Sequence, residues 1–103
     1  MKILLDENVP KVLKKHLDKP YHVFTAREMK WNGKLLGLMI ANGFEVLITA
    51  DKNLHYQQNL KKFPVAVFML DVKFDRPDSI EELAPSIIIA LKSKPKMGIT
   101  IIK

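Results

Sequence analysis

Two aspartates, Asp6 and Asp51, each follow a short apolar run of the kind that forms a buried strand. The first run is Met1–Leu5 and the second is Val46–Ala50, and a helix-like segment follows each aspartate. If both runs are parallel strands of one sheet, the two carboxylates lie at its carboxyl edge, where open α/β folds place their sites. Carboxylate oxygens are the ligands that Mg²⁺ and Mn²⁺ prefer. The pair therefore predicts a divalent metal centre, which can activate a water and neutralise charge on a phosphodiester.

Further polar side chains are expected at the same edge of the sheet, in the loops that follow the strands. Asn53 lies just after Asp51, and Asp71 ends the apolar run 65–70, so both are predicted to assist in binding the metal. Substrate contacts are predicted for five residues: Asn8, Lys34, Lys52, Tyr56 and Gln57. Tyr56 and Gln57 are able to stack on and hydrogen-bond to single-stranded bases, although such a tyrosine more often packs a loop against the protein body.

Each aspartate alone has a simpler interpretation, as a helix N-cap whose carboxylate accepts hydrogen bonds from backbone amides. The occurrence of Asp6 and Asp51 at matching strand ends favours the metal site. Other kinds of centre are disfavoured by composition, because the chain has no cysteine and its three histidines have no ligand spacing. With only four glycines, the chain also has no phosphate-cradling glycine loop.

The charge balance favours a polyanionic partner. Lysine and arginine total 17 against 11 aspartates and glutamates, which gives a formal net charge of +6 and an isoelectric point near 9.6. A surplus of this size on a small domain attracts nucleic acid by electrostatics alone. A solvated lysine coat without such a partner is the alternative.

The length of 103 residues predicts one domain, residues 1–103, with a single core. No segment reaches the roughly 18 apolar residues that a membrane-spanning helix needs. The apolar run at the N-terminus is too short for a signal peptide, since Asp6 and Glu7 follow it at once. We therefore expect a cytoplasmic protein without a membrane segment.

Strand-like and helix-like segments alternate along the chain. The expected strands are Ile3–Leu5, His22–Thr25, Val46–Thr49, Val65–Leu70 and Gly98–Ile102. The expected helices are Pro10–Leu17, Lys34–Ala41, Lys52–Lys62 and one that follows Ser79. This alternation predicts an α/β domain of three layers, α/β/α, with a mainly parallel sheet of about five strands.

Two helix starts carry sequence signals. Asn8, two residues before Pro10, is expected to be the N-cap of the first helix. Ser79 and Glu82 have the spacing of a capping box, with Ser79 as the N-cap of the last helix.

Several segments resemble a bacterial family of small PIN-like domains. The run Leu4-Leu5-Asp6-Glu7-Asn8-Val9-Pro10 resembles the family's opening LLDEN-x-P, and residues 49–54 resemble its T-x-D-x-(N/D) segment. Residues 56–60 read YQQNL, as in one subgroup, and Trp31 with residues 32–36 is similar to that subgroup's W…NGELL. The resemblance extends from Met1 to about Leu70, and the C-terminal third carries no motif of the family.

The resemblance implies a PIN-like fold and a metal-dependent nuclease. Many members act as toxin ribonucleases paired with an antitoxin protein, and many form homodimers. It also implies a Mg²⁺ or Mn²⁺ site in which Asp6 and Asp51 hold the metal, completed by an acid from the intervening helix. Here the chain departs from the motif, because Lys34 stands where the subgroup has Glu, and Asn53 stands where relatives often have Asp.

The lysine at position 34 leaves three alternatives open. An ammonium in place of a carboxylate changes the local charge by two units and weakens metal binding. Alternatively, Lys34 points outward and another acid (Glu7, Glu28 or Asp71) completes the site. In the third case, Lys34 contacts a phosphate in a domain that binds RNA without cutting it. The sequence therefore predicts a metal-dependent ribonuclease, for which the resemblance implies a toxin role, with a catalytically impaired RNA-binding or protein-interaction module as the alternative.

Overall fold

Strands and helices alternate along the part of the chain that the computed structural model describes, residues 1–17, 21–30, 35–50, 65–72 and 77–103. The elements in chain order are β1 (Lys2–Leu5), α1 (Val12–Leu17), β2 (His22–Thr25), α2 (Ala26–Met29), α3 (Leu35–Ala41), β3 (Val46–Thr49), β4 (Ala66–Leu70), α5 (Pro77–Glu81), α6 (Ala84–Lys92) and β5 (Gly98–Ile102). Among these described residues, no helix is long and apolar enough to cross a membrane.

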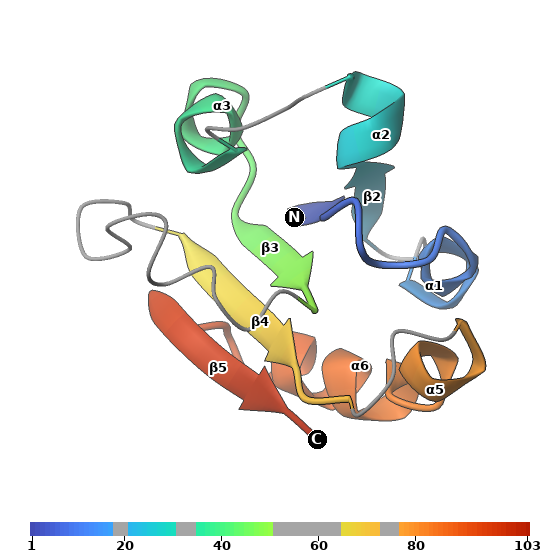
Figure 1. The fold of residues 1–103 in the computed structure, drawn as a ribbon. Coiled ribbons are helices and arrows are strands. Elements are labelled where there is room, and N and C mark those ends of the chain that lie inside the picture. Colours follow the sequence, from blue (N-terminus) through green and yellow to red (C-terminus); the bar gives the residue numbers. More distant parts are fainter. Residues whose placement is uncertain (18–20, 31–34, 51–64, 73–76) are drawn as a thin grey trace.

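The five strands form one sheet in the order β2-β1-β3-β4-β5, and every neighbouring pair is parallel. This confirms the predicted α/β fold with a parallel sheet. From β1 the chain moves one place to β2, then returns across β1 to β3 and continues in the opposite direction to β5 (Figure 1). The strand order therefore reverses at β1 and β3, which is one of the two common arrangements of doubly wound sheets.

Both faces of the sheet are covered by helices. On one face, α1, α5 and α6 pack over a cluster that includes Ile48 and Phe68. On the other face, α2 and α3 cover a smaller cluster that includes Leu4 and Leu47 (Figure 1). Leu47 and Ile48 are neighbours in sequence but belong to opposite layers, because successive strand residues point to opposite faces. This is why β3 is buried at every position and shows no polar alternation.

The segment before β5 differs from the expected single helix. Ser79 lies inside α5, which begins at Pro77, so the prediction that Ser79 is an N-cap was wrong. The helix α6 then starts anew after Leu83, with a proline in its first turn and no side-chain cap. Pro77 and Pro85 each fix φ for a first helical turn, and this divides the segment into two helices.

Candidate functional site

The carboxyl ends of β1 and β3 lie side by side at the place where the strand order reverses. Leu5 pairs with Ile48, and the backbone N–H of Asp6 donates to the carbonyl of Ile48 at 2.9 Å. In open α/β sheets, ligands bind in the crevice outside the carboxyl ends of the strands at such a point. Asp6 is therefore an acid that the fold places at the topologically favoured binding position.

Two hydrogen bonds orient the Asp6 carboxylate. The hydroxyl of Thr49 donates to Oδ2 at 2.8 Å, and the backbone N–H of Glu7 donates to Oδ1 at 2.8 Å. Thr49 is fully buried, so its hydroxyl is held in the protein interior. An ionised carboxylate has about four acceptor positions, and these two bonds leave others for a cation. Asp6 is not the N-cap of α1, because that helix begins only at Val12.

Asn8 secures the loop that carries Asp6. Its Oδ1 accepts a hydrogen bond from the backbone N–H of Ala50 at 3.1 Å, and the N–H of Val9 donates to the Asp6 carbonyl at 3.0 Å. The prediction that Asn8 is an N-cap was wrong, because its side chain bonds across to the end of β3 instead. This contact holds the β1–α1 loop against β3, beside Asp6.

A pocket of about 220 Å³ opens next to Asp6, between the loop after β1 and the end of β2. We call it the Asp6 pocket. Its lining residues are Asp6, Glu7, Val9, Pro10, Lys11, Thr25, Arg27 and Glu28. The pocket therefore brings carboxylates from two neighbouring strand ends into one concave surface.

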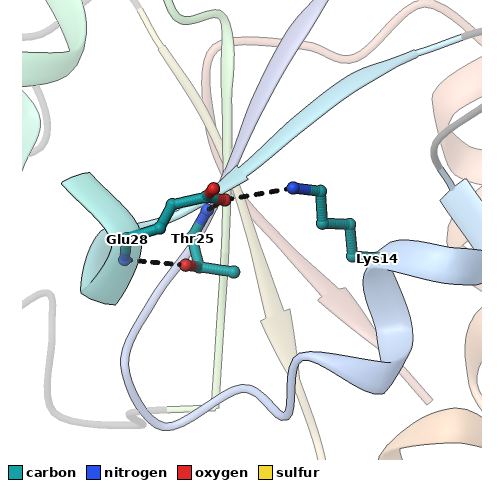
Figure 2. Close-up of polar contacts among 3 residues, drawn as sticks. All are labelled: Lys14, Thr25 and Glu28. Atoms are coloured by element: carbon teal, nitrogen blue, oxygen red, sulfur yellow. Dashed lines mark hydrogen bonds and ion pairs between the residues drawn. The ribbon is translucent and has the colours of Figure 1, made fainter.

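Glu28 is held by a capping box at the start of α2. Thr25 Oγ1 accepts from the backbone N–H of Glu28 at 3.0 Å, and the backbone N–H of Thr25 donates to Glu28 Oε1 at 2.7 Å. The Nζ of Lys14, from α1, also reaches Glu28 Oε1, at 3.2 Å (Figure 2). The Thr25 amide, followed by the Lys14 ammonium, holds the pKa of Glu28 below its ordinary value against the effect of desolvation. Glu28 is therefore a carboxylate at neutral pH.

The role of Glu28 as a cap was not anticipated, although its signal is present in the sequence. Residues 25–28 read T-x-x-E, which is the spacing of a capping box. Of this segment, only Thr25 belongs to the expected strand His22–Thr25, and no helix is expected directly after it. A strand that runs directly into a four-residue helix leaves no loop residues to mark the boundary.

Thr25→Ala is expected to lower the free energy of unfolding by about 0.5–2 kcal/mol, because the N–H of Glu28 loses its hydroxyl acceptor. Thr25→Ser is the matched control, since serine keeps the acceptor. Chemical denaturation of both variants measures the effect. Equal stability of the two variants would show that the Thr25 hydroxyl does not contribute.

The Glu28 contribution also predicts how stability depends on pH. Because the folded-state pKa of Glu28 is lowered, its stabilisation is present above the unfolded pKa and is lost as pH falls through the folded pKa. The size of this effect is reduced by solvent screening, since the Glu28 side chain is 43% exposed in its ion pair with Lys14.

The other predicted site residues are distributed as follows. Asp71 is exposed at the end of β4, and its backbone N–H donates to the Ile102 carbonyl at 2.8 Å. Since β3 lies between β4 and β1, Asp71 is two strand spacings from β1, roughly 10 Å sideways. Six predicted residues lie outside the described part of the chain: Lys34, Asp51, Lys52, Asn53, Tyr56 and Gln57.

The described residues alone do not make a complete metal centre. They contain no group of three or more histidine, cysteine, aspartate or glutamate side chains placed to hold an ion. Asp6 and Glu28 nevertheless line one pocket, and both are oxygen donors of the type that suits a hard dication. The donor set therefore fits Mg²⁺ or Mn²⁺ once a further acid joins Asp6.

Comparisons of the chain with protein-family models, with curated proteins and with solved structures found no match. The function of the protein is accordingly inferred from its residues and from the geometry around Asp6.

Proposed function

We propose that the protein is a metal-dependent ribonuclease in which Asp6 and Asp51 hold Mg²⁺ or Mn²⁺, assisted by Asn53 and Asp71. The observation that carries the proposal is the Asp6 carboxylate, fixed at the reversal of strand order by the Thr49 hydroxyl and the Glu7 amide. A preorganised carboxylate at this position supports cation binding, because a ligand already held in place needs no reorganisation when the ion arrives.

The residues around Asp6 define the chemistry that we propose. When bound, the dication supplies a water of lowered pKa and neutralises charge on the scissile phosphodiester. Asp6 keeps its orientation through Thr49, while Asn8 holds the loop against β3. The net charge of +6 draws RNA to the protein, and substrate contacts are proposed for Asn8, Lys34, Lys52, Tyr56 and Gln57. The toxin role, an antitoxin or homodimer partner and a cytoplasmic location are proposed from the PIN-like resemblance.

The test is a cleavage assay on labelled single-stranded RNA. The purified chain is expected to cut with Mg²⁺ or Mn²⁺, to stop in EDTA and to recover when the metal is restored in excess. Cleavage that is unchanged by EDTA, or absent with both metals, would contradict the proposal.

A catalytically impaired RNA-binding module is the second candidate function. It is favoured by Glu28, whose carboxylate already accepts hydrogen bonds from Thr25 and Lys14, and by Lys34 at the motif position of an acid. Lys34→Glu distinguishes the two candidates. Increased metal affinity and increased cleavage are expected if Lys34 weakens a nuclease site. RNA binding that persists in EDTA, without cleavage by either the chain or Lys34→Glu, would favour the binding module.

Thr49→Val is expected to lower metal affinity and cleavage by about 10–100-fold, the usual cost of losing a group that orients a metal ligand. Valine keeps the shape of threonine but removes the hydroxyl that donates to Asp6 Oδ2. Isothermal titration with Mn²⁺ and the cleavage rate measure the effect, and Thr49→Ser, which keeps the hydroxyl, should restore both. If Thr49→Val and Thr49→Ser lose activity equally, Thr49 acts through packing and not through Asp6.

A further inference from the structure

Two basic residues line the Asp6 pocket, one from each of the two segments that form it. Lys11 precedes α1 on the side of the β1 loop, and Arg27 belongs to α2 at the end of β2. Both are exposed, and neither takes part in the two ion pairs found among the described residues, Lys14–Glu28 and His16–Glu81. Both residues are therefore accessible to solvent, and their charges are not neutralised by Glu28 or Glu81.

The net charge around the Asp6 pocket depends on whether a divalent cation is bound to Asp6. Its three carboxylates, Asp6, Glu7 and Glu28, outnumber the charges of Lys11 and Arg27 by one. Lys14 offsets Glu28 from outside the lining, so the neighbourhood is close to neutral. A phosphodiester gains little from such a surface, but a dication on Asp6 makes the pocket distinctly positive.

The size of the pocket indicates which part of a nucleic acid it suits. At about 220 Å³ it is smaller than the roughly 300–1,000 Å³ of clefts that enclose a small molecule. It suits a phosphodiester of a strand that passes across the opening, and not an enclosed nucleotide. Arg27 offers a planar fork for two phosphate oxygens, and Lys11 offers a second positive charge, a compact ammonium.

We propose that Lys11 and Arg27 hold the phosphodiester backbone of single-stranded RNA across the Asp6 pocket, and that this binding is coupled to a divalent cation on Asp6. The inference rests on the proposed function and names the substrate contacts of the same site. Because linkage is reciprocal, RNA should raise metal affinity by the same factor by which the metal raises RNA affinity.

Fluorescence anisotropy with labelled single-stranded RNA tests the proposal, in Ca²⁺ or in EDTA and over a range of salt. Ca²⁺ is used in place of Mg²⁺ because it also takes oxygen ligands. The anisotropy is recorded before any of the RNA is cleaved, so that it measures binding alone. In Ca²⁺, each of Lys11→Ala and Arg27→Ala should reduce the slope of log affinity against log salt by about 0.7, and the double variant by about 1.4. The double variant should also bind at least about tenfold more weakly at low salt.

Lys92→Ala is the matched control. Lys92 is an exposed cation at the end of α6, and the chain continues from there to the start of β5. Because the strands are parallel, Lys92 lies toward their amino ends, whereas the Asp6 pocket is at their carboxyl ends. Its removal also lowers the net charge by one but should leave the slope unchanged. Asp6→Asn should reduce RNA affinity in Ca²⁺ to its value in EDTA.

Two results would overturn the inference. In the first, the double variant loses no more affinity than Lys92→Ala. In the second, RNA affinity is the same in Ca²⁺ and in EDTA. Failure of the nuclease proposal gives a different result from failure of this inference. In that case, RNA binding is coupled to the cation and depends on Lys11 and Arg27, but no RNA is cleaved in Mg²⁺ or Mn²⁺. Failure of the inference alone appears as metal-dependent cleavage that the two substitutions leave unchanged.

Discussion

Replacing Asp6 by Asn is expected to lower metal-dependent RNA cleavage by more than about 100-fold. Loss of a group that merely orients a metal ligand costs about 10–100-fold, so loss of the ligand's own charge should cost more. Asparagine has nearly the same shape as aspartate, and its carbonyl oxygen still accepts a hydrogen bond from Thr49 or from the Glu7 amide. The substitution therefore removes the negative charge at the metal position while disturbing the packing little.

Glu45→Gln is the control for this prediction. Glu45 is exposed just before β3, at the amino edge of the sheet, so the substitution removes one negative charge far from Asp6. Cleavage rates, Mn²⁺ affinity and melting temperature are compared for the two variants. Loss of cleavage and of Mn²⁺ affinity with an unchanged melting temperature supports the role of Asp6. Equal cleavage by Asp6→Asn and Glu45→Gln would exclude Asp6 from the metal site.

Strands are the part of the fold that the sequence predicts best. The bounds of the central strand β3 agree with the expected run Val46–Thr49, and those of the edge strand β5 agree with Gly98–Ile102. In a three-layer domain, an unbroken apolar run indicates a central strand, because a strand covered on both faces has no polar side to interrupt the run. The neighbours Leu47 and Ile48, each buried in a different layer, show why the pattern is so strong.

Capping signals were less reliable, because a polar side chain accepts whichever donor the folded chain brings near it. Asn8 has a good N-cap type before a proline, yet its side chain bonds to Ala50, 42 residues away. That donor depends on the pairing of β1 with β3, which no local pattern specifies. Ser79 has the capping-box spacing, but Pro77 begins α5 two residues earlier.

The candidate site shows the same division between local and long-range information. The position of Asp6 at a strand end follows from the apolar run before it. Its hydrogen bond from Thr49 depends on the register in which Leu5 lies beside Ile48. Glu28 enters the Asp6 pocket only because β2 pairs with β1, which brings the start of α2 beside the β1 loop. Strand order, and not residue type, therefore determines which charged groups share the pocket.

Phe68→Ala is expected to lower the free energy of unfolding by about 3–5 kcal/mol. Phe68 is almost fully buried in β4, on the face of the sheet that α1, α5 and α6 cover. Truncation removes the transfer free energy of the ring and leaves a cavity that strands on both sides prevent from collapsing. A domain of this size has a stability of about 5–15 kcal/mol, so a large part of it is lost. Urea denaturation measures the change.

Two further variants show whether the loss of stability in Phe68→Ala arises from a three-layer core. Leu47 is fully buried on the opposite face, so Leu47→Ala should also cost about 2–5 kcal/mol. Ile101 lies on the outermost strand β5 and is 57% exposed, so Ile101→Ala should change stability by only about 0.5 kcal/mol or less. A small effect of Leu47→Ala beside a large effect of Phe68→Ala would mean that α2 and α3 do not cover the sheet. Large losses of stability at both positions require that both faces of the sheet are buried. Helices packed on both faces keep the carboxyl ends of β1 and β3 in place beside Asp6.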